Sequence, residues 1–134
     1  MPIYNPNNMQ GAHRTDVIIL SEGDAPAVLM EWGHYFDTVP SLLSIQGGAI
    51  VNNISEHTIS VALRIMFNNI VLDSYVVRLT SATYTSAFFG TSLFNVIEGH
   101  HVFRILAQIT EGVTGDTATI TNRQVISISG VGTL

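Results

Sequence analysis

Apolar and polar residues alternate with a period of two along most of this chain. The pattern is clearest in HTISVALRIMFNNIVLDSYVVRL, residues 57–79, where apolar side chains occupy every second position from 59 to 67. Successive side chains of a strand point to opposite faces, so this alternation predicts a β-strand. Asn68 and Asn69 then separate it from a second β-rich run, and asparagine tolerates a positive φ angle. We therefore expect a β-hairpin closed by a two-residue primed turn.

Further β-rich runs follow at short intervals, separated by turn residues such as Gly23, Pro26 and Pro40. The pair Gly47-Gly48 also indicates a break. No long stretch has the apolar spacing of an amphipathic helix. About eight to ten short strands with frequent turns predict an all-β fold, either a sandwich or a barrel. The expected strands span 15–20, 27–32, 49–55, 59–67, 70–79, 82–90, 101–110, 118–122 and 123–131.

The first residues, 1–14, depart from this pattern, because they are rich in proline and asparagine. Such a composition predicts an extended N-terminal arm that has no structure of its own or becomes ordered only against a neighbour. We expect residues 15–134 to form one domain, since a chain of 134 residues is long enough to bury its own core.

Charged residues are scarce, at 11% of the chain, whereas a typical soluble domain has about 25%. A small domain with so few charges is expected to cover part of its surface with a partner, so we expect an oligomer. The net charge is −5, and the cations are scattered arginines without any lysine. The lack of a basic patch argues against binding to nucleic acid or to an anionic membrane. The arginines are Arg14, Arg64, Arg78, Arg104 and Arg123.

The chain has no cysteine, which excludes disulfides, thiolate catalysis and cysteine-ligated metals. The N-terminus is polar and lacks the apolar core of a signal peptide, so we expect none. No apolar run has the length of a transmembrane helix.

The stretch EGHH, residues 98–101, could be a metal site, an acid–base pair or a turn that starts a strand. His100 and His101 are adjacent, so in a strand they point to opposite faces and are poorly placed to share a metal. We therefore expect a turn in which Gly99 has a positive φ angle, followed by a strand. His57 also lies at a strand start, and we place His34 in a loop.

Aromatic residues could line a sugar-binding surface, but such side chains more often fill a core or a subunit interface. Phe88 and Phe89 are adjacent, so one ring is expected in the core and the other against a neighbouring subunit. The interface candidates are Trp32, Tyr35, Tyr84, Phe88 and Phe89.

Other chemistry has weak support in the sequence. No zinc-protease, nucleophile-elbow or phosphate-loop motif is present, and a paired-carboxylate glycosidase is left open. We expect no enzymatic activity, no cofactor and no metal. A calcium site remains open at four aspartates in or near loops, Asp24, Asp37, Asp73 and Asp116.

From residue 57 onward, the order of elements resembles the jelly-roll domains of the tumour necrosis factor and complement globular-head type. The resemblance rests on the turn MFNNIV, the run SATYTSAFFG, the step LFNVIEGHHVFRILAQI and the last strand RQVISISGV. It implies an antiparallel jelly roll, and members of this fold are usually trimers.

The ending HHVFRILAQITEGVTGDTATITNRQVISISGV also resembles C-terminal segments of tailed-bacteriophage structural proteins, although the second adjacent histidine departs from their pattern. This resemblance implies a component of the virion surface. It gives EGHH the role of a turn into an inner strand, and it gives Arg123 a structural role through a charge-assisted hydrogen bond to a carboxylate or to exposed carbonyls. The matching residues are Ala118, Thr119, Ile120, Asn122 and Arg123.

We therefore predict an antiparallel jelly-roll β-sandwich that forms a homotrimer in a virion. It would be a capsid decoration (cement) protein or a small tail or fibre component that binds the major capsid or tail protein. The alternative is a receptor- or glycan-binding head of a phage fibre that binds a host-surface glycan. It would use exposed aromatic residues, with Trp32 and Tyr35 as the candidates, together with carboxylates on loops at one end of the sandwich. A spore-surface or secreted adhesive domain, at a cell surface or outside the cell, is a third interpretation, but the Gly-X-Y stalk expected of it is missing.

Overall fold

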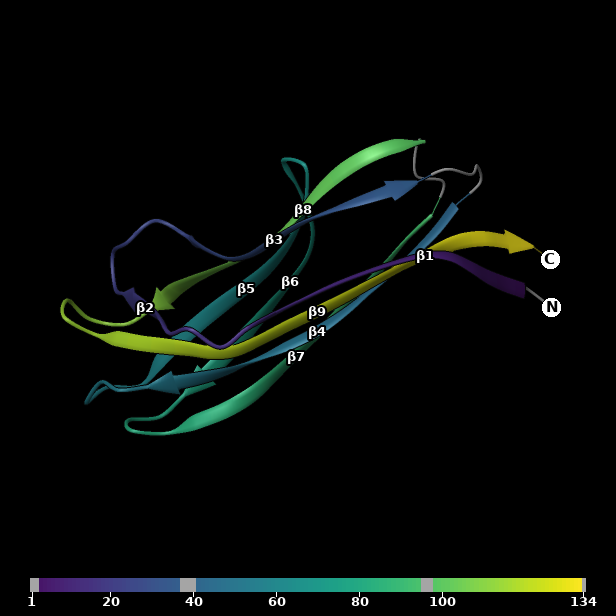
Figure 1. Cartoon of the computed structure of the whole chain (residues 1–134). Helices are drawn as coiled ribbons and strands as arrows, with labels where there is room; N and C mark the ends of the chain where they lie inside the picture. The colour runs from purple at the N-terminus through teal and green to yellow at the C-terminus, as the bar shows by residue number, and fades with distance from the viewer. Residues whose placement is uncertain (1–2, 37–40, 95–97, 134) are drawn as a thin grey trace.

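The computed structural model describes residues 3–36, 41–94 and 98–133, which form two antiparallel β-sheets packed face to face (Figure 1). One sheet has the order β1-β9-β4-β7, with β2 also paired to β9, and the other has the order β3-β8-β5-β6. From β2 onward the chain crosses between the sheets at every step except the β5–β6 hairpin, so the predicted jelly-roll sandwich is confirmed. The strands are β1 (Ile3–Arg14), β2 (Ile18–Ser21), β3 (Ala27–Phe36), β4 (Ser41–Asn53), β5 (Ile59–Phe67), β6 (Ile70–Leu79), β7 (Tyr84–Phe94), β8 (Gly99–Glu111) and β9 (Thr117–Thr133).

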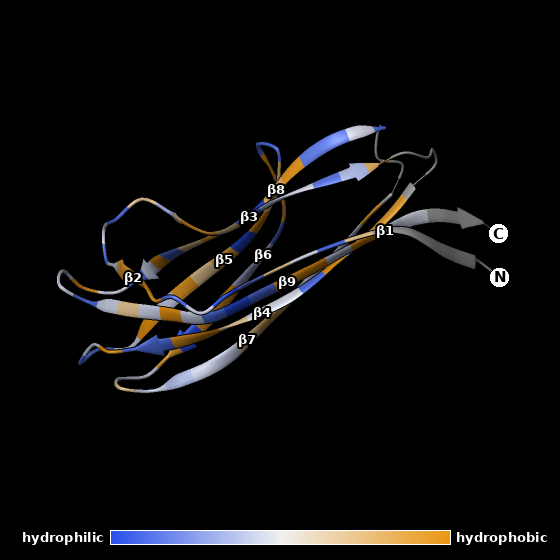
Figure 2. Ribbon diagram, in the orientation of Figure 1, coloured by the Kyte–Doolittle hydropathy of each residue, from blue (hydrophilic) through white to orange (hydrophobic). Residues whose placement is uncertain are grey.

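Hydrophobic and hydrophilic residues alternate along the strands (Figure 2). Because successive side chains of a strand point to opposite faces, one set lies between the two sheets. The odd positions of β8 from Phe103 to Ile109 are buried, and the residues between them are not. Side chains from both sheets with no exposed surface form the centre of the core, and they include Ile45, Val51, Ile59, Val61, Phe103, Ile105 and Ile120. No helix in the described ranges is long and apolar enough to cross a membrane.

The predicted hairpin is present, because β5 and β6 pair up to Phe67 and Ile70 and leave Asn68 and Asn69 as the two-residue turn. Asn68 has a φ angle of +53°, whereas Asn69 has no positive φ angle. The backbone N–H of Asn68 also donates to the carbonyl of Val102 on β8, at 2.9 Å. The left-handed strain of this turn therefore falls on its first residue alone.

β4 and β9 differ most from the ranges that the sequence indicates. β4 continues through Gly47-Gly48 without a break. Position 47 requires a glycine, because a Cβ there would lie only 2.4 Å from the carbonyl oxygen of Gln124 and 2.6 Å from the Phe89 ring. β9 is one strand where we expected two: Asn122 has a φ angle of +48°, next to a register shift between β4 and β9. A bulge at this point absorbs one residue without ending the strand.

The N-terminal segment, which we expected to be an extended arm, is a β-strand over the residues that the structure describes. It forms β1, which pairs antiparallel with β9 from Ile3 opposite Thr133 to Arg14 opposite Arg123. The two ends of the chain therefore lie side by side (Figure 1). Without β1, most of the long strand β9 would be an open edge with unpaired backbone groups, and covering that edge favours the strand.

Candidate functional site

The two histidines of EGHH lie where the pattern placed them, at the start of β8 on opposite faces. The His101 ring packs inside, with ring centroids 5.5 Å from Phe36 and 5.1 Å from Phe67. His100 is exposed and covers Gly33 of β3, where an added Cβ would meet its ring. Gly99 has a φ angle of +127°, as predicted for the turn. These residues therefore start a strand and do not form a shared site.

The aspartates considered for calcium do not converge. Asp37 lies outside the described residues, Asp24 lies between β2 and β3, and the Asp73 carboxylate accepts hydrogen bonds from Ser74 and Tyr75 within β6. Within the described ranges, no group of three or more histidine, aspartate or glutamate side chains could hold a metal ion.

His34 lies in β3 and not in a loop, and it has no exposed surface. Its Nδ1 atom lies 2.8 Å from the hydroxyl oxygen of Ser127, and its Nε2 atom lies 2.6 Å from that of Ser129. Trp32 Nε1 donates to the same Ser127 oxygen at 2.9 Å. A chain of polar groups therefore crosses the core from β3 to β9.

One assignment of donors and acceptors is consistent with all three of these hydrogen bonds. Trp32 donates to Ser127, Ser127 donates to His34 Nδ1, and His34 Nε2–H donates to Ser129. This arrangement requires a neutral imidazole. Burial lowers the pKa of His34 below its ordinary value of 6.5, which favours the neutral form. Hydrogen-bonded polar groups in a core fix how the two sheets pack, so we assign the chain a structural role.

Arg123 is buried, with 2% of its side chain exposed, and points inward from β9. Its Nη2 atom donates to Asp16 at 2.5 Å, so the predicted pairing with a carboxylate is present. Nε and Nη1 of Arg123 are buried without a hydrogen-bond partner among the described residues. Desolvation raises the pKa of Asp16, but attraction by Arg123 and then by Arg14 outweighs it, so the pKa lies below its usual range. This ion pair joins the β1–β2 link to β9.

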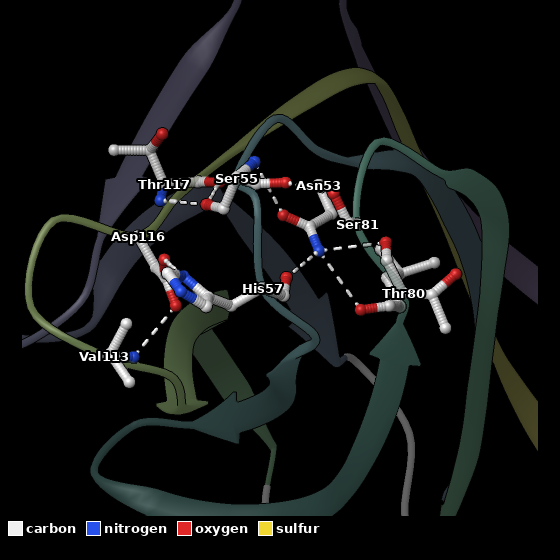
Figure 3. Close-up of polar contacts among 9 residues, drawn as sticks. Asn53, Ser55, His57, Thr80, Ser81, Val113, Asp116 and Thr117 are labelled. Carbon is white, nitrogen blue, oxygen red and sulfur yellow. Dashed lines mark hydrogen bonds and ion pairs between the residues drawn. The ribbon is translucent and has the colours of Figure 1, made fainter.

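At the end of the sandwich opposite the termini, a polar cluster joins three loops (Figure 3). The Asn53 side-chain nitrogen lies 2.8 Å from the His57 carbonyl and 3.0 Å from the Thr80 carbonyl. The Ser55 hydroxyl donates to the carbonyl of Thr117 at 2.8 Å and accepts from its N–H at 2.6 Å. Nearly all of these partners are main-chain groups, so the cluster fixes the loops.

His57 and Asp116 form the one pair in this cluster that resembles part of a catalytic site. His57 Nδ1 lies 2.9 Å from Asp116 Oδ1, and the other carboxylate oxygen accepts from Val113 N–H at 2.8 Å. The Val113 hydrogen bond and then His57 lower the pKa of Asp116. The hydroxyl hydrogen of Ser55, which belongs to the same cluster, is already donated to a carbonyl, so Ser55 is not arranged to pass a proton to His57. This geometry favours a structural role.

The five aromatic interface candidates divide into two groups. Trp32 and Phe89 are buried, and the Trp32 ring stacks on Phe103 with centroids 5.6 Å apart. Tyr35, Tyr84 and Phe88 are exposed, at 50%, 75% and 76%. Phe89 thus fills the core while Phe88 faces outward, as expected for adjacent strand residues. Trp32 and Tyr35 do not form an aromatic groove, since Trp32 lies on the core face of β3 and Tyr35 on its outer face.

The outer surface of the β1-β9-β4-β7 sheet has no charged side chain among those that the structure describes. Strand pairing defines cross-strand rows on this surface, for example His13, Gln124, Gly48 and Phe88, because paired residues share a face. We call this surface the uncharged face. It consists of Met9, Gly11, His13, Ile19, Ser44, Gln46, Gly48, Ile50, Asn52, Tyr84, Ser86, Phe88, Gly90, Ser92, Thr119, Thr121, Gln124, Ile126 and Ile128.

The outer surface of the other sheet is different. Arg104 of β8 pairs with Glu31 of β3 at 2.7 Å, and Arg64 of β5 donates to Gln108 at 3.3 Å. Figure 2 shows no strongly hydrophilic residue along the described part of β7. Charges on the strands are therefore concentrated on one side of the sandwich.

A groove of about 790 Å³ crosses the uncharged face beside Phe88. The residues that line it include three glycines, Gly11, Gly47 and Gly90, together with Phe88 and Ile126. The groove exists because glycines interrupt rows of larger side chains. The sequence held a signal for this face in the uncharged run from 84 to 94, but the pairing of β7 with β4, and of β4 with β9, was needed to assemble it.

No protein-family model matches this sequence, and no curated protein matches it. Solved structures with a similar fold include the VP2 subviral particle of infectious bursal disease virus, with a TM-score of 0.57 and 16% identity over 95% of this chain and 32% of that chain. The T13 particle of the same virus gives a TM-score of 0.56 at 13% identity, over 92% and 32% of the two chains. This chain spans about a third of the length of those proteins, and such low identity makes the likeness one of fold alone.

Proposed function

We propose that this chain is a structural subunit of a virus particle, a homotrimeric capsid decoration or small tail or fibre component. It acts by binding copies of itself and the major capsid or tail protein, and it carries out no reaction. The fold supports this proposal, because virus-particle proteins are among the solved structures that share the jelly roll. The phage assignment rests on the resemblance of the C-terminal segment described above.

The observation that carries the proposal is the uncharged face. When one face of an antiparallel sheet packs on the core, the opposite face meets water and normally carries polar and charged side chains. Here it exposes Phe88, Tyr84 and Ile126, at 76%, 75% and 49%, with no charge beside them. Extended apolar surfaces of this kind mark protein–protein contacts. A protein that works by assembly needs such a surface, whereas an enzyme needs a cleft with reactive groups.

The glycan-binding alternative is less well supported. Sugar sites combine exposed aromatic rings with hydrogen-bonding groups, and the prediction required carboxylates beside the rings. The expected pair of Trp32 and Tyr35 does not form, and the exposed Tyr84 and Phe88 have amide and hydroxyl neighbours without any carboxylate.

The solution mass tests the proposal directly. Light scattering coupled to size exclusion should give about three times the 14.5 kDa of one chain. A single-chain mass at high protein concentration would contradict self-association and would favour the glycan-binding alternative. Incubation with purified capsids, followed by sedimentation, then tests whether the oligomer binds a particle.

A further inference from the structure

The proposed self-association needs a surface, and the structure offers one. We propose that copies of this chain associate through the uncharged face, with Phe88 of one copy inserted into the groove beside Phe88 of a second copy. This inference rests on the proposed function and adds to it the surface and the contact residue.

Phe88 projects from the uncharged face, with 76% of its surface exposed. Its Cα partner across the β4–β7 ladder is Gly48, and a Cβ added to Gly48 would lie 3.3 Å from Phe88 Cδ1. The ring therefore lies close against the bare backbone of Gly48. Exposed aromatic side chains often dominate interface energies.

The groove next to Phe88 is suited to an apolar side chain. Its walls include Ile126 and Phe88 itself, and Gln46 and Gln124 at its sides can form hydrogen bonds to amides of a partner. Each copy thus carries a projecting ring and a groove on the same face. The ring of one copy can therefore enter the groove of the next in a head-to-tail contact, which can close into a trimer and favours a second copy as the occupant over an unrelated protein.

The size of the face is sufficient. From Ser44 to Asn52, β4 is about 30 Å long, and four strands about 4.8 Å apart give a projected area of roughly 600 Å². A specific interface needs about 500 Å² or more from each partner. Side-chain relief makes the accessible area larger than the projected area, so the face alone can support a stable contact.

Charge also favours pairing through this face. Two copies with a net charge of −5 each repel one another. The described carboxylates lie on the strands of the other sheet, as Glu31 does, or in links and loops, as Asp16 does. Contact through the uncharged face keeps these groups in water and brings no like charges together, whereas contact through the other sheet would bury ion pairs at a high desolvation cost.

The decisive experiment compares solution masses at equal protein concentration. Phe88→Asp places a carboxylate at the centre of the proposed contact. The matched control is Val76→Asp, because Val76 is 66% exposed but lies on β6 in the other sheet. We expect an oligomer for the wild type and for Val76→Asp, and a 14.5 kDa single chain for Phe88→Asp.

The outcomes separate the two proposals. If the wild type is an oligomer and Phe88→Asp keeps the same mass, the assigned face is wrong while the proposed function stands. A wild type that is a single chain overturns both self-association and this interface. Circular dichroism of each variant shows whether the fold is intact.

A second measurement works even if Phe88→Asp fails to fold. The chain has no cysteine, so a single cysteine can be introduced at Ser86 on the uncharged face or at Ser74 on β6, both exposed in one chain. In the assembled protein, maleimide should label Ser86→Cys at least ten times more slowly than Ser74→Cys. Equal labelling rates would overturn the assigned interface.

Discussion

His34 on β3 and Ser129 on β9 are joined across the interior of the sandwich, with 2.6 Å between the imidazole Nε2 atom and the hydroxyl oxygen. Ser127 holds the other ring nitrogen at 2.8 Å, so the ring bridges the two sheets at both of its nitrogen atoms. The bridge holds a neutral imidazole, and it should therefore make the stability of the fold depend on pH.

Because burial lowers the pKa of His34 in the folded state, folding opposes protonation of this ring. The contribution of the neutral His34 ring to stability is fully present above the ordinary pKa of 6.5. This contribution is lost as the pH falls from 6.5 through the lower pKa of the folded state. We expect the thermal midpoint to drop between pH 7.5 and pH 5.5, and His34→Gln to reduce that drop. His100→Gln, which removes an exposed ring on β8 in the other sheet, should keep the wild-type drop; an equal reduction in both variants would contradict the assignment.

The Ser127 hydroxyl serves two partners, so its removal should be costly. Ser127→Ala leaves the Trp32 N–H without an acceptor and His34 Nδ1 without a donor, both in the core. We expect a loss of about 2–4 kcal/mol in unfolding free energy, since each unsatisfied buried group costs roughly 1–3 kcal/mol. Urea unfolding followed by the fluorescence of the chain's one tryptophan measures this loss. Ser74→Ala on the surface should change stability little, and equal stability of the two variants would contradict the proposed hydrogen-bond chain.

The fold is easier to predict from the sequence than the hydrogen bonds that link Trp32, His34, Ser127 and Ser129. Alternation from 59 to 67 and from 101 to 110 identifies strands because each covers the core with every second residue. His34 was assigned to a loop because Gly33 and Pro40 flank a mixed segment. Only its partners across the sandwich, Ser127 and Ser129, explain why a histidine is tolerated there. Those contacts span more than ninety positions of the chain and leave no local pattern.

The uncharged face cannot be predicted from local sequence for a related reason. Its members come from five strands, and adjacency depends on the strand order. The glycines illustrate the difficulty most clearly. Gly47-Gly48 reads locally as a break, yet the close approach of Phe89 and of the Gln124 carbonyl requires a glycine inside a continuous strand. A glycine in a strand can mark a turn, a bulge or a close packing contact, and only the tertiary structure distinguishes them.

Gly47 offers a direct test of this packing. A Cβ added at Gly47 would lie 2.4 Å from the Gln124 carbonyl oxygen, whereas one added at Gly11 would lie 3.4 Å from the Val125 carbonyl oxygen. We expect Gly47→Ala to lower the unfolding free energy by about 3 kcal/mol, because β4 and β9 must separate to admit the methyl group. Gly11→Ala should cost less than about 1 kcal/mol. Similar urea midpoints for the two variants would show that the sheet yields easily at Gly47.

The turn between β5 and β6 distinguishes two neighbouring asparagines. Asn68 has a φ angle of +53° and Asn69 has no positive φ angle, so a β-branched residue is strained only at the first position. We expect Asn68→Val to lower the unfolding free energy by about 1–2 kcal/mol. Asn69→Val should cost clearly less, and Asn68→Gly should be tolerated because glycine adopts positive φ angles freely. Urea unfolding of the three variants gives the comparison. If the two valine variants lost the same stability, the assignment of the positive φ angle to Asn68 alone would be wrong.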